Sequence, residues 1–263
     1  MNSTRSTLSE EIRLAIEVAA NLIRAAGNGV VLTGAGISTP SGIPDFRSPG
    51  SGLWSRYNPM EVASLSAFRY KPENFLDWFH PLAEKILFAL PNPAHQALTL
   101  LEKAGYLHTI ITQNIDGLHQ RAGSEQVLEV HGTLETLTCI GCFKKFESDG
   151  FIPGYIHDHE PPRCPDCGTI LKPDVILFEE QLPKQTWLKA LQACQGCSII
   201  LVVGSSLEVV PVATLPLRAL ENDARLIIIN ESPTYLDSQA AVVINRDAAE
   251  ILPLVSKRVI END

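Results

Sequence analysis

The chain has little positive charge for its size. It carries 21 lysine and arginine residues against 30 aspartate and glutamate residues, which gives a formal net charge of -9 at pH 7. A surplus of negative charge repels the phosphate backbone, so we do not expect direct binding to nucleic acid. A lysine-bearing peptide would be a more compatible partner.

Apolar runs that suit a membrane are also lacking. The N-terminal stretch MNSTRSTLSEEI shows no apolar core of a signal peptide. The most apolar segment, residues 198–217, contains Glu208, Pro211 and Pro216, which do not suit a membrane-spanning helix. We therefore expect a cytoplasmic protein with reduced thiols and no membrane partner.

The sequence shows no internal repeat and no low-complexity tract. Its 263 residues are 45% hydrophobic and 19% charged, which is typical of a folded globular chain with one large domain or a domain with an insertion. Residues 9–26 have helical periodicity, with a possible capping box at Thr7 and Glu10 and an end at Gly27. Further helices are expected at 72–88, 93–104, 183–194, 212–222 and 248–258.

Continuous Val, Ile and Leu segments separated by helices predict an α/β fold with a parallel sheet covered on both faces. The expected strands are 29–32, 106–111, 127–130, 198–203, 226–229 and 242–244. Ligands of such sheets bind beyond the carboxyl ends of the strands. We expect one crevice there, because polar clusters follow four strands: Gly34-Ala35-Gly36, Thr112-Gln113-Asn114, Gly204-Ser205-Ser206 and Asn230.

The loop Gly34–Arg47, GAGISTPSGIPDFR, is the most specific signal. Its first glycines follow a predicted strand, where open backbone N–H groups can bind a pyrophosphate because no Cβ blocks close approach. Residues 112–119 follow another strand. There, Asn114 and Asp116 could pair with an amide such as nicotinamide, or they could simply cap a strand–helix turn.

Two histidines are candidates for a general base. His131 follows the strand 127–130 and precedes Gly132, which places it near the expected crevice. His119 is the competitor, one turn into a possible helix. We interpret His80, His95 and His108 as structural.

The cysteines fall into three CxxC pairs. Cys139, Cys142, Cys164 and Cys167 have the spacing of a closed, structural zinc site. Cys194 and Cys197 could form a redox pair or an alternative ligand set, but their place between a helix and a buried strand favours inert, buried thiols. The segment 157–160, His-Asp-His-Glu, could bind a metal, although the flanking prolines favour a solvated loop.

Six of these motifs, taken together and in their order along the chain, form a recognisable pattern. They are Gly34–Ser38, Gly42–Arg47, Thr112–His119, His131-Gly132, the pairs Cys139/Cys142 and Cys164/Cys167, and Gly204–Ser206.

That set and order resemble the sirtuin family of NAD-dependent protein deacylases, from about Ile12 to Ile251. The resemblance implies a Rossmann-type NAD-binding domain formed by residues 1–38, 89–134 and 172–263. It also implies a cofactor-binding loop and helical module at 39–88 and a zinc-ribbon module at 135–171. NAD would be consumed as a co-substrate, and one structural zinc would be bound.

The implied activity is deacetylation of acetyl-lysine peptides. The acyl group passes to ADP-ribose and nicotinamide is released. His131 would be the base, with Asn114 as a second catalytic residue, and Phe46 would shield the reactive ribose carbon. The residues implied in NAD binding are Gly34, Ala35, Gly36, Ser38, Asp45, Phe46, Arg47, Gln113, Asn114, Ile115, Asp116, Gly204, Ser205, Ser206, Asn230 and Ala248.

The peptide would add as a strand along Val175, Ile176, Leu177 and Phe178. Here the chain departs from the family, because Glu179 stands where glycine is usual. We hypothesise that this carboxylate favours basic flanking residues in the peptide or narrows the entrance.

A Tyr-x-x-Arg pair marks relatives that prefer succinyl or malonyl lysine. The corresponding positions here hold Phe79 and Leu82, so acetyl or apolar acyl groups are expected, because a buried acidic group would have no cation to pair with. Longer apolar chains and protein mono-ADP-ribosylation remain alternatives. A non-catalytic NAD-sensing module and a thiol oxidoreductase are less favoured. We expect a monomer.

Overall fold

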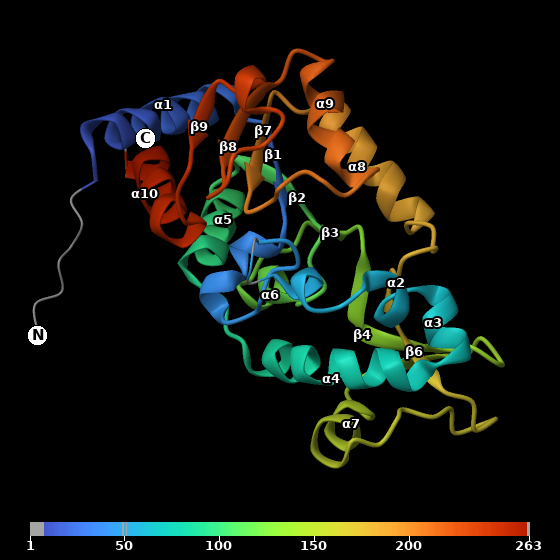
Figure 1. Cartoon of the computed structure of the whole chain (residues 1–263). Helices are drawn as coiled ribbons and strands as arrows, with labels where there is room; N and C mark the ends of the chain where they lie inside the picture. The colour runs from blue at the N-terminus through green and yellow to red at the C-terminus, as the bar shows by residue number, and fades with distance from the viewer. Residues whose placement is uncertain (1–7, 49, 51, 262–263) are drawn as a thin grey trace, which may run out of the picture.

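The computed structural model describes residues 8–48, 50 and 52–261 (Figure 1). Within them, a six-stranded parallel sheet has the order β3-β2-β1-β7-β8-β9. Numbered along the chain, this is the 3-2-1-4-5-6 order of the doubly wound Rossmann fold. The strands are β1 (Gly29–Thr33), β2 (Leu107–Thr112), β3 (Val127–Glu129), β7 (Ile199–Val203), β8 (Arg225–Ile229) and β9 (Val242–Ile244).

Helices cover both faces of this sheet, as the sequence predicts (Figure 1). The central strands β1 and β7 are buried along their whole length, because Val, Ile and Leu face both helical layers. One face packs on α1 (Glu10–Ala26), α5 (Pro93–Lys103) and α10 (Ala248–Glu261), and the other on α8 (Lys184–Gly196) and α9 (Leu215–Leu220).

The first helix begins at a different residue from the one expected. Ser9 is the N-cap of α1, and its Oγ accepts the N–H of Ile12. Thr7, the predicted cap, lies outside the described residues. Gly27 ends α1 in the left-handed conformation, as predicted.

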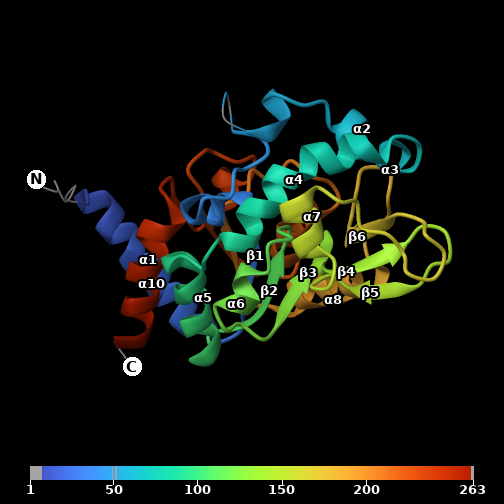
Figure 2. The same ribbon diagram turned by 90° about the horizontal axis from the view of Figure 1, so that it is seen from below.

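A second region lies to one side of the large sheet (Figure 2). Its own core contains Phe68, Phe75 and Phe79. The elements are α2 (Pro59–Val62), α3 (Leu65–Tyr70), α4 (Pro72–Phe88), α7 (Ile152–Asp158) and an antiparallel sheet of β5 (Lys145–Glu147), β4 (Gly132–Cys139) and β6 (Leu171–Val175). A short helix, α6 (Leu118–Arg121), follows the polar turn after β2.

The small sheet straddles the predicted module boundaries. β4 begins at Gly132 and β6 ends at Val175, so both strands extend beyond the segment 135–171. The division of the chain into modules stays a prediction.

The segment 157–160 is not wholly a loop. His157 and Asp158 belong to α7, because Tyr155 and Ile156 are buried against α4, and the Tyr155 hydroxyl donates to the Leu76 carbonyl at 2.6 Å. The apolar residues of this turn therefore outweigh the flanking prolines that suggested a loop. None of the helices in the described residues is long and apolar enough to cross a membrane.

Candidate active site

The crevice expected at the strand ends is present where the strand order reverses, between β1 and β7. A cavity of ≈ 620 Å³ opens there, which we call the glycine-rich cavity. Polar clusters from four strand ends meet in it, as the sequence predicts. Its lining includes Gly34, Ala35, Gly36, Gln113, Asn114, Gly204, Ser205, Ser206, Asn230 and Ala248.

The two glycines of the first turn serve a different purpose from the one expected. The N–H of Gly34 donates to the Val203 carbonyl at 3.1 Å and that of Gly36 donates to the Gly204 carbonyl at 2.9 Å. A Cβ on Gly36 would lie 2.9 Å from Cα of Gly204. The prediction of open amides at these positions is therefore wrong, and the glycines let the turns after β1 and β7 pack against each other.

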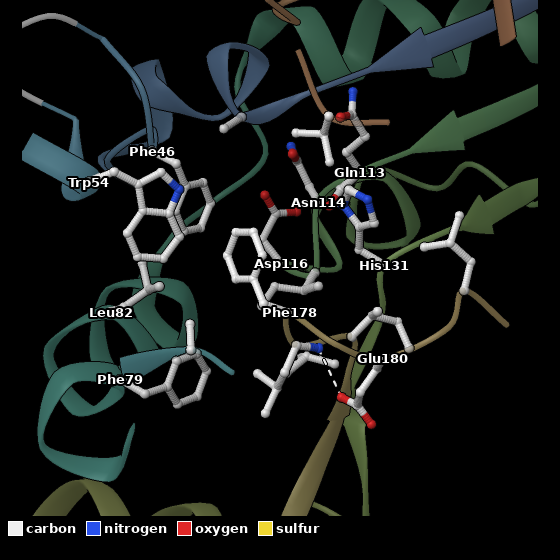
Figure 3. A pocket seen from close by; sticks show the side chains of 18 of the residues that line it. Phe46, Trp54, Phe79, Leu82, Gln113, Asn114, Asp116, His131, Phe178 and Glu180 are labelled. Carbon is white, nitrogen blue, oxygen red and sulfur yellow. Dashed lines mark hydrogen bonds between the residues drawn. The ribbon is translucent and has the colours of Figure 1, made fainter. Parts of the chain in front are cut away.

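A second cavity of ≈ 700 Å³, the aromatic cavity, adjoins the first (Figure 3). Phe46 and Trp54 lie with ring centroids 5.2 Å apart, and Trp54 stacks on Trp78 at 5.5 Å. Phe79 and Leu82, the positions expected to set acyl preference, also line it. The remaining apolar lining includes Phe75, Ile86, Val175, Leu177 and Phe178.

His131 lines both cavities. It lies between β3, an edge strand of the large sheet, and β4, the middle strand of the small sheet. Its Nδ1 lies 3.0 Å from the carbonyl oxygen of Gln113, which can only accept, so Nδ1 carries the proton. The Nε2 lone pair is then free to accept a proton.

The environment of His131 keeps it neutral. Burial lowers its pKa below the ordinary value of 6.5, and the nearby positive charge of Arg47 acts in the same direction, while the bond to Gln113 opposes them. A neutral imidazole is the form that a general base requires at pH 7.

His119 does not have this position. It is buried away from both cavities, and its Nε2 lies 2.9 Å from the Thr33 hydroxyl. Burial lowers its pKa to about 3. Of the two candidates, only His131 can meet a ligand.

A buried polar network lies behind the junction of the cavities. Asn114 Nδ2 donates to the Gly34 carbonyl and to Ser38 Oγ, both at 3.1 Å. Ser38 Oγ in turn donates to Asp116 Oδ2 at 2.7 Å, and burial raises the pKa of Asp116. Asn114 and Asp116 thus do more than cap a turn, because their side chains are fixed at the cavity wall (Figure 3).

The end of the glycine loop is held by its own residues. Asp45 Oδ1 accepts the N–H groups of Arg47 at 3.0 Å and Ser48 at 2.8 Å, so this carboxylate supports the loop. Arg47 lines both cavities and forms an ion pair with Glu208, with 3.4 Å between Nε and Oε2.

The segment expected to bind peptide runs between the small sheet and the helical region. Val175 ends β6, and beyond it the Ile176 N–H donates to the His131 carbonyl at 2.8 Å. Phe178 exchanges backbone hydrogen bonds with Ala63 and Leu65. Ile176, Leu177 and Phe178 line the aromatic cavity but are not part of β6.

Glu179 adopts a left-handed conformation with φ of 73°, which explains why glycine suits this position. Its Oε2 accepts the N–H of Ser66 at 2.9 Å, in the first turn of α3. The carboxylate therefore ties the segment to α3 while the residue also lines the aromatic cavity.

The four cysteines predicted to bind zinc come together. All their sulfur atoms lie within 4.8 Å of one another, with Cys139–Cys167 at 3.5 Å and Cys142–Cys164 at 3.6 Å. Thiolates on one zinc, each about 2.3 Å from the metal, would be roughly 3.8 Å apart. The N–H groups of Gly141 and Cys142 point at Cys139 Sγ, both at 3.4 Å, which suits a thiolate. The donor set fits a structural zinc.

The remaining cysteine pair lies elsewhere. Cys194 and Cys197 are buried in the layer between α8 and the large sheet. Burial raises the pKa of both thiols, that of Cys197 to about 11, so they are poor nucleophiles. The interpretation as inert structural thiols agrees with this position.

Sequence reasoning missed Trp54, the pair of Lys172 and Glu180, and Glu208. Lys172 Nζ lies 2.9 Å from Glu180 Oε2, which also accepts the Leu177 N–H at 2.9 Å. Glu180 is labelled in Figure 3. A lysine next to a leucine in a short strand, with two acidic residues at 179 and 180 after it, was the available signal for this pair. Trp54 lies in a single 3-10 turn (Leu53–Ser55) and Glu208 in a loop, and neither segment is long enough for periodicity to mark the buried side.

The chain is similar in sequence to a family of known proteins. The Sir2 family model matches residues 34–211. The chain is 44% identical over 253 residues to NAD-dependent protein deacylase 2 of Archaeoglobus fulgidus, which covers 96% of this chain and 97% of that protein. It is 41% identical over 242 residues to NAD-dependent protein deacetylase 1 of Geobacillus kaustophilus, which covers 92% of this chain and 97% of that protein.

Solved structures are similar over the same extent. A structure from work on the mechanism and regulation of Sir2 enzymes aligns with a TM-score of 0.90 at 42% identity, covering 95% of this chain and 100% of that one. A Sir2 homologue in complex with NAD aligns with a TM-score of 0.84 at 38% identity, covering 94% of both chains. With a family model that matches most of its length, relatives above 40% identity and the same fold, the chain belongs to the Sir2 family.

Proposed function

We propose that the protein is an NAD-dependent protein-lysine deacetylase. The observation that carries the proposal is the position of His131, with a free Nε2, where the glycine-rich and aromatic cavities meet. Two ligands that approach from the two cavities would react beside this imidazole. Homologues named NAD-dependent protein deacetylase, and Sir2 structures with NAD and with a p53 peptide, support the proposal.

The glycine-rich cavity would hold the adenosine and phosphate portions of NAD. The turns at Gly34–Gly36 and Gly204–Ser206, together with Asn230 and Ala248, provide a closely packed wall for the adenosine half. Arg47 would contribute positive charge to the phosphates. Ser38 is buried in the wall of the aromatic cavity and acts by positioning Asn114 and Asp116.

The nicotinamide end would lie against Asn114, Ile115 and Asp116. Asn114 Oδ1 and the Asp116 carboxylate can both accept from the NH₂ group of a neutral carboxamide, because Asn114 Nδ2 already donates to Gly34 and Ser38. This arrangement places the Asp116 carboxylate beside a neutral group and not beside phosphate. Bound NAD supplies an electrophilic ribose carbon and a nicotinamide leaving group. Phe46, packed on Trp54, would exclude water from this carbon.

His131 would accept a proton at Nε2 from the ribose hydroxyl that attacks the acyl group. Gln113 fixes the tautomer through its backbone carbonyl, and its side chain is anchored to Ser205 Oγ at 2.9 Å. The base is thus neutral, oriented and adjacent to both ligands before the reaction begins.

The acyl-lysine would enter the aromatic cavity. Its peptide backbone would pair with Val175–Phe178, and Phe178 is already anchored to the helical region by Ala63 and Leu65. The zinc would hold β4, β5 and β6 in register and take no part in the chemistry, because four thiolates close its coordination sphere. We also propose that the chain acts as a cytoplasmic monomer on protein substrates, without binding nucleic acid.

Longer apolar acyl chains are a second candidate substrate. A further cavity of ≈ 500 Å³ shares Phe79, Ile86 and Ile115 with the aromatic cavity, so an apolar chain that passes this wall would find more apolar surface. A related Sir2Af2 structure contains a myristoylated histone peptide.

Mass spectrometry of NAD products with acetyl, octanoyl and myristoyl lysine peptides tests the proposal. We expect nicotinamide, free lysine peptide and acyl-ADP-ribose in equal amounts. Protein that becomes ADP-ribosylated, with no acyl-ADP-ribose formed, would instead indicate mono-ADP-ribosyl transfer. Binding of NAD without any product would indicate a sensing module.

A further inference from the structure

The glycine-rich cavity has an unexpected charge balance for a site that would receive a pyrophosphate. Among the described residues, its charged lining consists of two arginines and three acidic residues. Anions bind where cations or amide dipoles outnumber acidic groups, so this excess of carboxylate requires an explanation. The charged lining residues are Asp45, Arg47, Glu208, Glu231 and Arg246.

The carboxylates are not equivalent. Asp45 is used within its own loop, where it accepts backbone N–H groups. Glu208 forms an ion pair with Arg47, whereas no ion pair of Glu231 is present in the part of the chain that the structure describes. Glu208 therefore neutralises Arg47, which is one of the two arginines that could face the phosphates.

The ion pair joins two different loops. Arg47 ends the glycine loop after β1, and Glu208 lies in the loop after β7, next to Val209, which lines both cavities. The Arg47 and Glu208 side chains are 33% and 62% exposed, so the pair is reached by solvent and can separate at small cost. The Nε–Oε2 distance of 3.4 Å leaves the terminal guanidinium nitrogens open to another anion.

We propose that Glu208 competes with the pyrophosphate of NAD for Arg47 and thereby sets the affinity of the protein for NAD. This inference rests on the proposed function, because it takes NAD to be the ligand of the glycine-rich cavity. NAD binding then exchanges one partner of Arg47 for another, and the carboxylate of Glu208 is released to solvent. A residue outside the reacting atoms would thus determine how much NAD is needed for half-saturation.

The alternative is that Glu208 helps NAD to bind, and it predicts the opposite change in the Kd for NAD. If Glu208 positioned Arg47 for the phosphates, its neutralisation would weaken NAD binding. The exposure of Glu208 and the open end of the guanidinium favour competition.

Calorimetric titration of NAD and of ADP-ribose into the E208Q variant tests the proposal without any turnover. Exposed ion pairs contribute about 0.2–1 kcal/mol, so we expect a decrease in Kd of roughly 1.4- to 5-fold at low ionic strength. The gain should shrink as salt is raised to about 0.5 M, because exposed charges are screened.

E231Q is the matched control, because it removes the same charge from the same cavity without breaking an ion pair. We expect a smaller gain for E231Q than for E208Q. In an R47Q background, E208Q should lose its advantage over E231Q. Unchanged or weaker binding by E208Q, an equal gain for E231Q, or an advantage of E208Q over E231Q that persists in R47Q would each overturn the proposal.

The same titrations separate this inference from the proposed function. If the wild-type protein binds neither NAD nor ADP-ribose, the proposed function fails. If it binds both and E208Q binds equally well, only the competition fails.

Discussion

The imidazole Nδ1 of His131 lies 3.0 Å from the backbone carbonyl oxygen of Gln113. A carbonyl cannot donate, so this contact fixes the proton on Nδ1 and leaves Nε2 as the acceptor. Replacing His131 with alanine should preserve NAD binding and lower kcat by roughly 10²- to 10⁴-fold, the usual contribution of a general base. Calorimetry and steady-state assays of one preparation measure both, and turnover near that of wild type would refute the role.

The fall of kcat/KM at acidic pH should reflect protonation of His131. Burial lowers the pKa of His131 below 6.5, so the neutral base persists at pH 7 and is lost only as pH falls through this lowered value. We expect kcat/KM to be flat near neutrality and to fall at more acidic pH than an exposed histidine would give. A midpoint above 6.5 would contradict this.

Acyl preference should follow the wall formed by Phe79 and Leu82. Both are buried and line the aromatic cavity without offering a cation. A succinyl carboxylate would be desolvated without a partner there, so acetyl peptide should be preferred by at least about tenfold in kcat/KM. The double variant Phe79→Tyr with Leu82→Arg should raise the succinyl-to-acetyl ratio, and comparable wild-type turnover of both peptides would rule the explanation out.

Zinc should be required for stability and not for the chemical step. Cys164→Ser removes one of four clustered ligands and should lower both the zinc content and the melting temperature. Cys197→Ala is the matched control, because it removes a buried thiol far from the cluster and should keep one zinc per chain. Elemental analysis and thermal unfolding measure the two effects, and loss of zinc from the control alone would contradict the ligand assignment.

The ion pair between Lys172 and Glu180 should stabilise the peptide-binding segment. Their side chains are only 10% and 21% exposed, and Glu180 also accepts the Leu177 N–H. Glu180→Ala would leave the buried lysine charge without its carboxylate and with only the Pro173 and Val175 carbonyls as acceptors, so we expect the free energy of unfolding to fall by roughly 2–4 kcal/mol. The exposed pair of Lys144 and Asp166 is the comparison, and Asp166→Asn should change little in urea unfolding.

Substitutions of Glu179 can separate the effect of its positive φ from that of its hydrogen bond to Ser66. Glu179→Gly relieves the positive φ but removes the bond to Ser66, whereas Glu179→Ala keeps the strained backbone and loses the same bond. The alanine variant should therefore melt at a lower temperature than the glycine variant. If peptides with basic and acidic flanks keep the same ratio of kcat/KM in wild type and Glu179→Gly, this residue does not set flanking preference.

The sequence predicted the parts that follow from regular patterns. The longer helices, the parallel strands and the meeting of their polar ends follow from burial, which leaves a periodic trace. The short helices α2, α3 and α7 and the strands of the small sheet were not predicted. His131 was identified from its place after a strand. Its Nδ1 bond to Gln113 could not be predicted, because it joins residues that follow two different strands. Likewise, the bonds of Gly34 and Gly36 to the turn after β7 depend on tertiary contact, which is why the amides were wrongly expected to be open.

Only Val130 and His131 separate β3 of the large sheet from β4 of the small sheet. The proposed base is thus mounted on the joint between the two, and its backbone carbonyl is held by Ile176 of the substrate segment. A change in the angle between the sheets would turn the imidazole together with the peptide that it serves. A foreign zinc module that set a different angle between the sheets would therefore re-aim the proposed base even if every lining residue were kept.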